Sequence, residues 1–379
     1  MRFSGFDDEW KSYRIGDISK TYSGGTPSTS KKVYYYGNIP FIKSGEINKS
    51  CTEQYINEDA INNSSAKKVK KGDLLLALYG ATSGEVAISK IDGAINQAVL
   101  KIDNNMDNYF QYNYFLKYKE KIIHKYLQGG QGNLSANIIK KLEFKFPKME
   151  EQQKISRFLL LIDEKIQLLK KKHKEYQNFK KYLMQQIFTQ KLRFNFTDDW
   201  NYMNFSEIFK SVSTKKYQIK SADILDKGDF EVIDQGQDEI AGYFNDKTKL
   251  CQELPIIIYG DHTTFVKFRD KPFIVGADGV KLLIPKFNAN PKYLFYALEH
   301  FNIKPEGYKR HFSIIKKIKL PIPTLEEQNE ISEIFTYIDI KLKYTKIQLQ
   351  ETEEFKKGLL QQMFVVQLIL SLLQNKKHI

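Results

Sequence analysis

The sequence has few of the residues that build metal centres, disulfide frameworks or membrane spans. Its 379 residues include two cysteines, Cys51 and Cys251, which lie far apart and form no metal-type pair. This usage indicates a reducing compartment, and we expect a cytoplasmic protein. The longest apolar run, residues 364–373, is interrupted by Gln367 and Ser371. A bilayer span takes roughly 20 apolar residues, so no membrane partner is expected.

Motifs of common enzyme classes are also missing. No glycine-rich loop ends in Gly-Lys-Ser/Thr, and the six histidines are scattered without metal-ligand spacing. Residues 290–293, Asn-Pro-Lys-Tyr, lack the second proline of the Asn/Asp-Pro-Pro-Tyr/Phe motif of adenine methyltransferases. Pro291 fits better as the first residue of a helix. We expect no catalytic residue, no metal and no cofactor on this chain. A fused methylase or nuclease remains an alternative that needs such a motif.

The charge balance points to a polyanionic partner. Lys and Arg number 59 against 45 Asp and Glu, a net charge of +14. A surface this basic attracts nucleic acid, because binding releases counterions from the phosphates. An ordinary protein with a lysine-rich surface is the alternative. Hydrophobic residues make up 41% of the chain, which is enough for real cores, and the length suits two domains.

The sequence repeats itself once. Residues 149–155 return at 325–331 and residues 179–188 return at 355–364, an offset of 176 at both places. Trp10 and Trp200, the chain's two tryptophans, fall at matching points near the start of each copy. The unit that repeats is therefore a globular domain followed by the repeated segment.

Each repeated segment is predicted to be a long helix with a coiled-coil seam. Steps of four and three give the seams Ile155, Leu159, Ile162, Ile166, Leu169, His173, Tyr176, Lys180, Leu183, Ile187 and Ile331, Phe335, Ile338, Leu342, Thr345, Leu349, Thr352, Lys356, Leu359, Met363. Thr324 and Glu327 predict a capping box. Residues 150–193 carry 11 basic and 5 acidic residues, and residues 326–369 carry 5 and 8. Opposite net charges favour pairing of the two helices. Two helices on separate cores are the alternative.

We therefore predict an α+β fold with a pseudo-two-fold internal repeat. Two small mixed α/β domains are each followed by a long helix, and the helices pair as an antiparallel coiled coil. The expected segments are the first domain 1–147, first helix 148–191, second domain 192–323, second helix 324–366 and C-terminal tail 367–379. Strands are expected at 38–42, 73–78, 94–102 and 255–260, and shorter helices at 109–126 and 291–301.

The order of motifs resembles the specificity (S) subunit of type I restriction-modification systems, over essentially the whole chain. The likeness rests on residues 2–10, 23–28, 38–42, 132–135 and 147–152, and on 199–200, 260–263, 277–281 and 321–328. It implies two target-recognition domains, each reading one half of a bipartite asymmetric site on double-stranded DNA. It implies that the helices are a spacer and a docking surface for two methyltransferase (M) subunits, which restriction/translocase (R) subunits join for cleavage.

In this family the S subunit does no chemistry, so the resemblance places S-adenosylmethionine, ATP and Mg on partner subunits only. A coiled-coil adaptor and a stand-alone sequence-specific DNA-binding protein are the alternatives. The two domains differ where the first has Gly24-Gly25-Thr26-Pro27 and the second has Thr214-Lys215-Lys216-Tyr217. A shared frame with different loops suits two readers of different targets.

The candidate DNA contacts carry hydrogen-bond donors or acceptors and are expected to lie on loops. Glutamine can bond adenine, arginine can bond guanine, and lysine can bind phosphate. The first-domain candidates are Lys31, Lys32, Tyr34, Tyr36, Lys43 and Ser44. The second-domain candidates are Gln235, Gln237, His262, Thr263, Thr264, Lys267 and Arg269. The alternative for each is a solvated loop residue, a packed tyrosine or an ordinary turn histidine.

Overall fold

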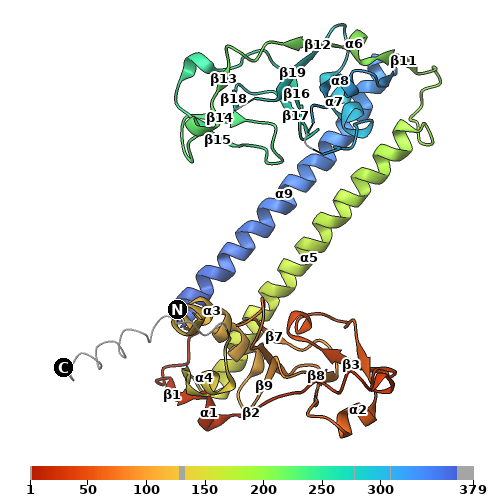
Figure 1. The fold of residues 1–379 in the computed structure, drawn as a ribbon. Helices are drawn as coiled ribbons and strands as arrows, with labels where there is room; N and C mark the ends of the chain where they lie inside the picture. Colours follow the sequence, from red (N-terminus) through yellow and green to blue (C-terminus); the bar gives the residue numbers. More distant parts are fainter. Residues whose placement is uncertain (1, 128–132, 277, 308, 365–379) are drawn as a thin grey trace. The chain divides into compact units, whose positions relative to one another are not determined.

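A computed structural model describes residues 2–127, 133–276, 278–307 and 309–364. The chain divides into two compact units, residues 1–169 with 348–379 and residues 170–347. Each unit holds one globular domain and a part of both long helices (Figure 1). The expected tail 367–379 lies outside the described residues. Among the described residues, no helix combines the length and apolarity that crossing a bilayer requires.

The first domain contains two four-stranded sheets. The antiparallel sheet has the order β2-β9-β6-β7. The second sheet has the order β4-β3-β8-β5, with β3 and β8 parallel. The elements are β1 (Lys11–Arg14), α1 (Ile15–Ile18), β2 (Lys20–Ser23), η1 (Lys32–Tyr35), β3 (Ile39–Ile42), η2 (Ser44–Glu46), β4 (Tyr55–Ile56), α2 (Glu58–Asn62), β5 (Lys67–Val69), β6 (Leu74–Ala77), β7 (Val86–Ile88), β8 (Gly93–Ile95), β9 (Val99–Asp103), α3 (Asn108–Leu127), α4 (Ala136–Lys141) and β10 (Glu143–Phe146).

The second domain repeats most of this frame. Its antiparallel sheet has the order β12-β19-β16-β17, and its other sheet the order β13-β18-β14-β15. The elements are β11 (Asn201–Asn204), α6 (Phe205–Ile208), β12 (Phe209–Val212), β13 (Gln218–Ile219), η3 (Ser221–Asp223), β14 (Phe230–Ile233), β15 (Gly242–Phe244), η4 (Lys247–Lys249), β16 (Ile256–Gly260), β17 (Val266–Arg269), β18 (Ile274–Gly276), β19 (Val280–Pro285), α7 (Pro291–His300), α8 (Phe312–Ile315) and β20 (Lys319–Ile322).

The frames differ at one edge strand. Strand β5 follows β4 in the sequence and pairs antiparallel with β8. Its counterpart β13 precedes β14 and pairs parallel with β18. The loops beside this edge therefore have different lengths and origins in the two domains. The predicted α+β class with an internal repeat is confirmed, and this edge is one place where the two domains diverge.

Local sequence explains the central elements. Every residue of β6 and of β16 is buried, as continuous apolar runs predict for strands covered on both faces. Helix α7 begins at Pro291, and the Asn290 side chain accepts hydrogen bonds from Lys292 N and Tyr293 N. This is a helix N-cap, which accounts for the Asn-Pro pair.

The single strand predicted at 94–102 is wrong. The segment forms two strands, β8 and β9, which belong to different sheets. Between them the Asn96 side chain accepts a hydrogen bond from Ala98 N at 3.1 Å, and Asn96 O accepts one from Val99 N at 3.2 Å. This asparagine turn breaks the apolar run and carries the chain from one sheet to the other.

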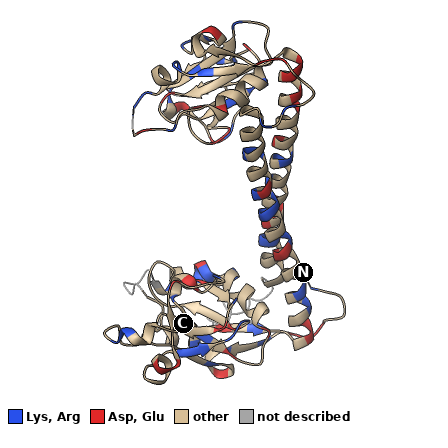
Figure 2. Cartoon of the chain, turned by 90° about the vertical axis from the view of Figure 1, so that its right-hand side faces the viewer, with Lys and Arg blue, Asp and Glu red and all other residues tan. Residues whose placement is uncertain are grey.

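The two long helices are α5 (Met149–Phe188) and α9 (Leu325–Phe364). Helix α5 ends three residues before the expected boundary, because Gln190 has a left-handed φ of 57° and Lys191 N bonds back to Gln186 O at 2.9 Å. Charged residues of both signs line both helices (Figure 2). The capping box at Thr324 is half formed. Glu327 N donates to Thr324 Oγ1 at 3.4 Å, but the Glu327 carboxylate binds Arg193 and Trp200 instead.

Much of each seam is buried within its unit. In the first unit, Ile155, Leu159 and Ile162 share a core with Leu359 and Met363. In the second unit, His173 contacts Thr345 at 2.9 Å and Lys180 contacts Asp339 at 2.9 Å. Along these contacts the residue numbers of α9 fall as those of α5 rise, so this part of the helix pair is antiparallel.

Candidate nucleic-acid interface

An open groove of about 490 Å³ lies in the first domain, beside η1 and the loops that follow β2 and β8. Its walls combine hydroxyl, amide, aromatic and ammonium groups. The lining residues are Thr26, Thr29, Lys32, Tyr35, Tyr36, Phe41, Lys43, Gln54 and Asn96. Amides and hydroxyls can bond base edges, and lysines can bind phosphates. The groove therefore carries the chemistry that DNA reading needs.

Two glycines allow this groove to form. A Cβ on Gly24 would lie 1.7 Å from Ile95 O, and one on Gly25 would lie 2.6 Å from Ser65 Cβ. The loop after β2 therefore passes directly over the end of β8, where Gly24 N donates to Asn96 O at 3.1 Å. The Gly-Gly-Thr-Pro motif is explained by this close backbone approach.

Three of the six first-domain candidates line the groove: Lys32, Tyr36 and Lys43. Tyr36 is 75% exposed, whereas Tyr34 is 7% exposed and packs in a core with Phe41. Tyr34 is therefore a core residue, and its hydroxyl accepts a hydrogen bond from Lys31 Nζ at 3.2 Å. Lys31 and Ser44 lie outside the lining, with Ser44 at the start of η2.

The second domain has a groove of about 600 Å³ at the corresponding place, beside η3 and the segments after β12 and β18. Its lining residues are Lys215, Gln218, Ile219, Lys220, Ser221, Asp223, Phe244, Lys249 and Asp278. Gln218 Nε2 donates to Asp278 Oδ1 at 2.6 Å. The sequence-based candidates missed this groove. Its signal was the segment Thr214–Tyr217, which occupies the place of the Gly-Gly-Thr-Pro loop.

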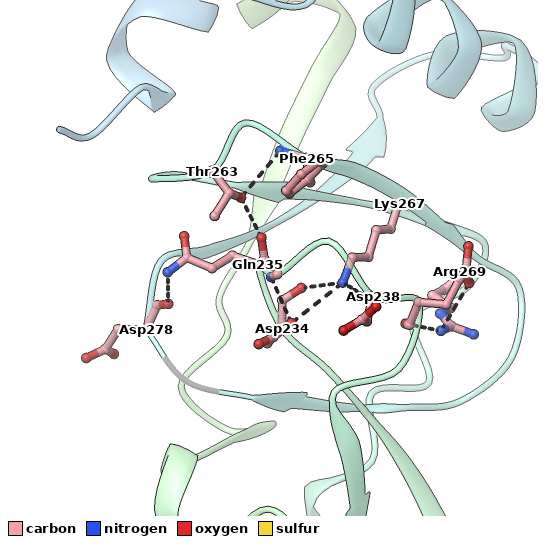
Figure 3. Close-up of polar contacts among 10 residues, drawn as sticks. Asp234, Gln235, Asp238, Thr263, Phe265, Lys267, Arg269 and Asp278 are labelled. Atoms are coloured by element: carbon pink, nitrogen blue, oxygen red, sulfur yellow. Dashed lines mark hydrogen bonds and ion pairs between the residues drawn. The ribbon is translucent and has the colours of Figure 1, made fainter. Parts of the chain in front are cut away.

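The second-domain candidates instead gather around the β16–β17 hairpin (Figure 3). Gln235 Nε2 donates to Asp278 O at 3.1 Å, and Gln235 Oε1 accepts from His262 N at 3.1 Å. Thr263 Oγ1 donates to Gln235 O. Gln235 therefore joins the hairpin to the turn beside the groove, and both ends of its amide are engaged. Gln237 is exposed, and Thr264 is buried with a left-handed φ of 61°.

Lys267 and Arg269 make internal contacts, which corrects the role expected for them. Lys267 is 7% exposed and donates to the backbone oxygens of Asp234 and Asp238 (Figure 3). Burial lowers the pKa of its ammonium, and the nearby Asp234 carboxylate opposes that shift. Arg269 bonds Glu231 at 3.1 Å and Glu239 O at 2.6 Å. Both cations hold the 234–239 loop in place, so they are not free donors for phosphate or bases.

The comparisons with known proteins all point to one family. The model of the type I restriction modification DNA specificity domain matches residues 7–178 and 197–354. The MjaIX specificity subunit of a Methanocaldococcus jannaschii type I restriction enzyme is 32% identical over 176 residues, which is 44% of this chain and 40% of that protein. The MjaVIII specificity subunit from the same organism is 22% identical over 397 residues, covering 93% and 91%.

The fold has solved relatives. The crystal structure of a type I restriction-modification S subunit from M. genitalium matches with a TM-score of 0.68 at 18% identity, covering 96% of this chain and 97% of that one. At this identity the likeness concerns the fold alone. It supports two domains alternating with two long helices.

Proposed function

The chain belongs to the type I restriction-modification DNA specificity family, and from this premise we propose that each of its two domains reads one half of a bipartite asymmetric DNA site. Membership confirms the resemblance found in the motif order. The chain is a DNA-recognition subunit rather than an enzyme, and it assembles with other subunits of its system. Half-site reading, the subunits it binds and their number belong to the proposal.

One observation carries the two-reader proposal: both grooves lie at the same place in a shared frame, and their chemistry differs. The first groove offers Gln54, whose amide matches the N6 and N7 groups of adenine. The second offers Asp223 and Asp278 among three lysines. A carboxylate accepts from the cytosine amino group and repels acceptor edges. The two grooves therefore favour different bases.

The helices supply the surface for partner subunits. On the part of α9 in the second unit, Tyr337, Ile340, Tyr344 and Ile347 are exposed at steps of three and four. This spacing is a second apolar seam, which suits an added helix from a partner. Two methyltransferase subunits dock on the helices, and restriction/translocase subunits join them. S-adenosylmethionine, ATP and Mg belong to those partners, and the complex works in the cytoplasm, where the DNA is.

Selection from a pool of random-sequence duplexes tests the proposal. The full chain should enrich a split motif with unlike halves, at a defined spacing. Replacing Gln54 by alanine should relax one half and leave the other unchanged. Enrichment of no motif would favour the protein-only adaptor, and a palindromic motif would contradict two different readers.

A further inference from the structure

Each long helix carries one lysine within its seam, and both lysines are largely covered and form ion pairs. Lys180 of α5 is 14% exposed, and its Nζ lies 2.9 Å from Asp339 of α9 and 3.2 Å from Glu299 of α7. Lys356 of α9 is 13% exposed, and its Nζ lies 2.7 Å from both carboxylate oxygens of Asp163 of α5. Seam positions are usually apolar, so these two lysines need an explanation.

The two ion pairs occupy equivalent positions of the repeat, but the two long helices exchange roles in them. Lys180 and Lys356 are 176 residues apart, and so are Asp163 and Asp339, which is the offset of the repeat. In the first unit α5 supplies the aspartate, and in the second unit α5 supplies the lysine. The repeat has therefore placed an equivalent ionic contact in each unit.

Each pair also includes the neighbouring globular domain. Tyr109 of α3 donates its hydroxyl to Asp163, and Tyr296 of α7 donates to Asp339 at 2.8 Å. Lys180 Nζ also lies 5.1 Å above the Tyr296 ring. We name Asp163, Lys356 and Tyr109 the first junction, and Lys180, Asp339, Glu299 and Tyr296 the second. Each junction joins both long helices to the helix that packs against the antiparallel sheet of its domain.

The junctions discriminate between helix registers. If α9 moved by seven residues, the apolar seam would still meet an apolar seam, because its pattern has this period. Lys180 would then face Ser332 or Lys346, and Lys356 would face Ser156 or Lys170. Either shift separates both lysines from the aspartates with which they pair. Buried ion pairs contribute little net stability, and fixing register is their best-attested role.

We infer that the two junctions are positioning elements that fix how each domain is held on the helix pair, and that they thereby set the half-site spacing the chain accepts. This inference rests on the two-reader proposal. A one-heptad shift displaces a helix by about 10 Å, or about three base pairs of DNA. Each base pair also rotates a half-site by roughly 35°, since B-DNA turns once per 10–10.5 pairs. A domain that is held less firmly on the helix pair accepts half-sites separated by a few more or fewer base pairs.

The test is the same random-duplex selection, with the spacing between halves as its readout. The first-junction variant is Asp163→Asn with Lys356→Met, and the second is Lys180→Met, Asp339→Asn and Glu299→Gln. Both sets remove the charges together, so no buried charge is left unpaired, and asparagine can still accept the tyrosine hydroxyl. Lys171→Met is the matched control, because Lys171 lies on α5 in an exposed pair with Glu175.

We expect wild type and Lys171→Met to enrich one spacing. The junction variants should select the same bases in each half-site but also accept spacings one to three base pairs away from the wild-type spacing. Enrichment at those spacings should be at least about tenfold higher than for wild type, which corresponds to about 1.4 kcal/mol. A folded junction variant with the wild-type spacing distribution would overturn the inference. So would loss of folding in both variants, which would assign the junctions to stability. Failure of wild type to select two halves would instead contradict the proposed function.

Discussion

Removing the lysines of the second groove should change the salt dependence of DNA binding. The perturbation is Lys215→Ala, Lys220→Ala and Lys249→Ala in one chain. All three line the groove, and none makes an ion pair with a described residue. Each phosphate neutralised by a cation contributes about −0.9 to the slope of log K against log salt. The slope should become shallower by up to about 2.7 if all three lysines contact phosphates.

The control removes the same charge from the same domain. Lys227, Lys271 and Lys304 are exposed and lie outside the groove lining. Their replacement by alanine lowers the net charge equally, so it reports the general effect of charge on binding. Fluorescence anisotropy with one labelled duplex at five salt concentrations gives both slopes. Equal changes in the two triple variants, with equal thermal midpoints, would refute a DNA-binding groove at this place.

Three further outcomes follow from the contacts. Trp200→Phe should cost about 1.5–3 kcal/mol in urea unfolding, because Trp200 Nε1 donates to the buried Glu327 carboxylate at 2.9 Å. Trp10→Phe should cost less, since Trp10 Nε1 has no partner among the described residues; equal losses would contradict this assignment. Lys267→Met should lower the thermal midpoint and leave the salt slope unchanged, whereas a shallower slope would restore Lys267 as a phosphate contact. Tyr344→Ser should weaken co-purification with a methyltransferase subunit and leave the selected DNA motif intact, and undiminished co-purification would argue against the second apolar seam.

The long helices could be predicted because their signal is local and repeated. The heptad steps, the absence of proline and the matched offset all point to the same structure. Continuous apolar runs likewise indicated β6 and β16. The register of the pair could not be predicted from apolar residues, which repeat every seven positions. The lysines at 180 and 356 carry that information, but it becomes visible only when their aspartates are placed opposite them.

The groove residues were harder to predict because neighbours in sequence have different environments. Tyr34 and Tyr36 are two residues apart, yet one is in a core and the other in a groove. Lys267 was expected to be free, but it alternates along β17 with Phe268, and its face of the strand is covered by the 234–239 loop. That loop is brought there by the pairing of β14 with β18, a contact between residues distant in sequence.

Exchange of one reading domain tests the two-reader proposal most directly. Residues 201–322, from β11 to β20, would be replaced by the corresponding segment of another S subunit, and the hybrid expressed with a methyltransferase partner. Mapping methylated adenines across the host genome then reports the recognised sequence. We expect one half-site to change, while the other half-site and the asymmetry of the target persist. A change in both halves, or a palindromic target for the unaltered chain, would contradict the proposal.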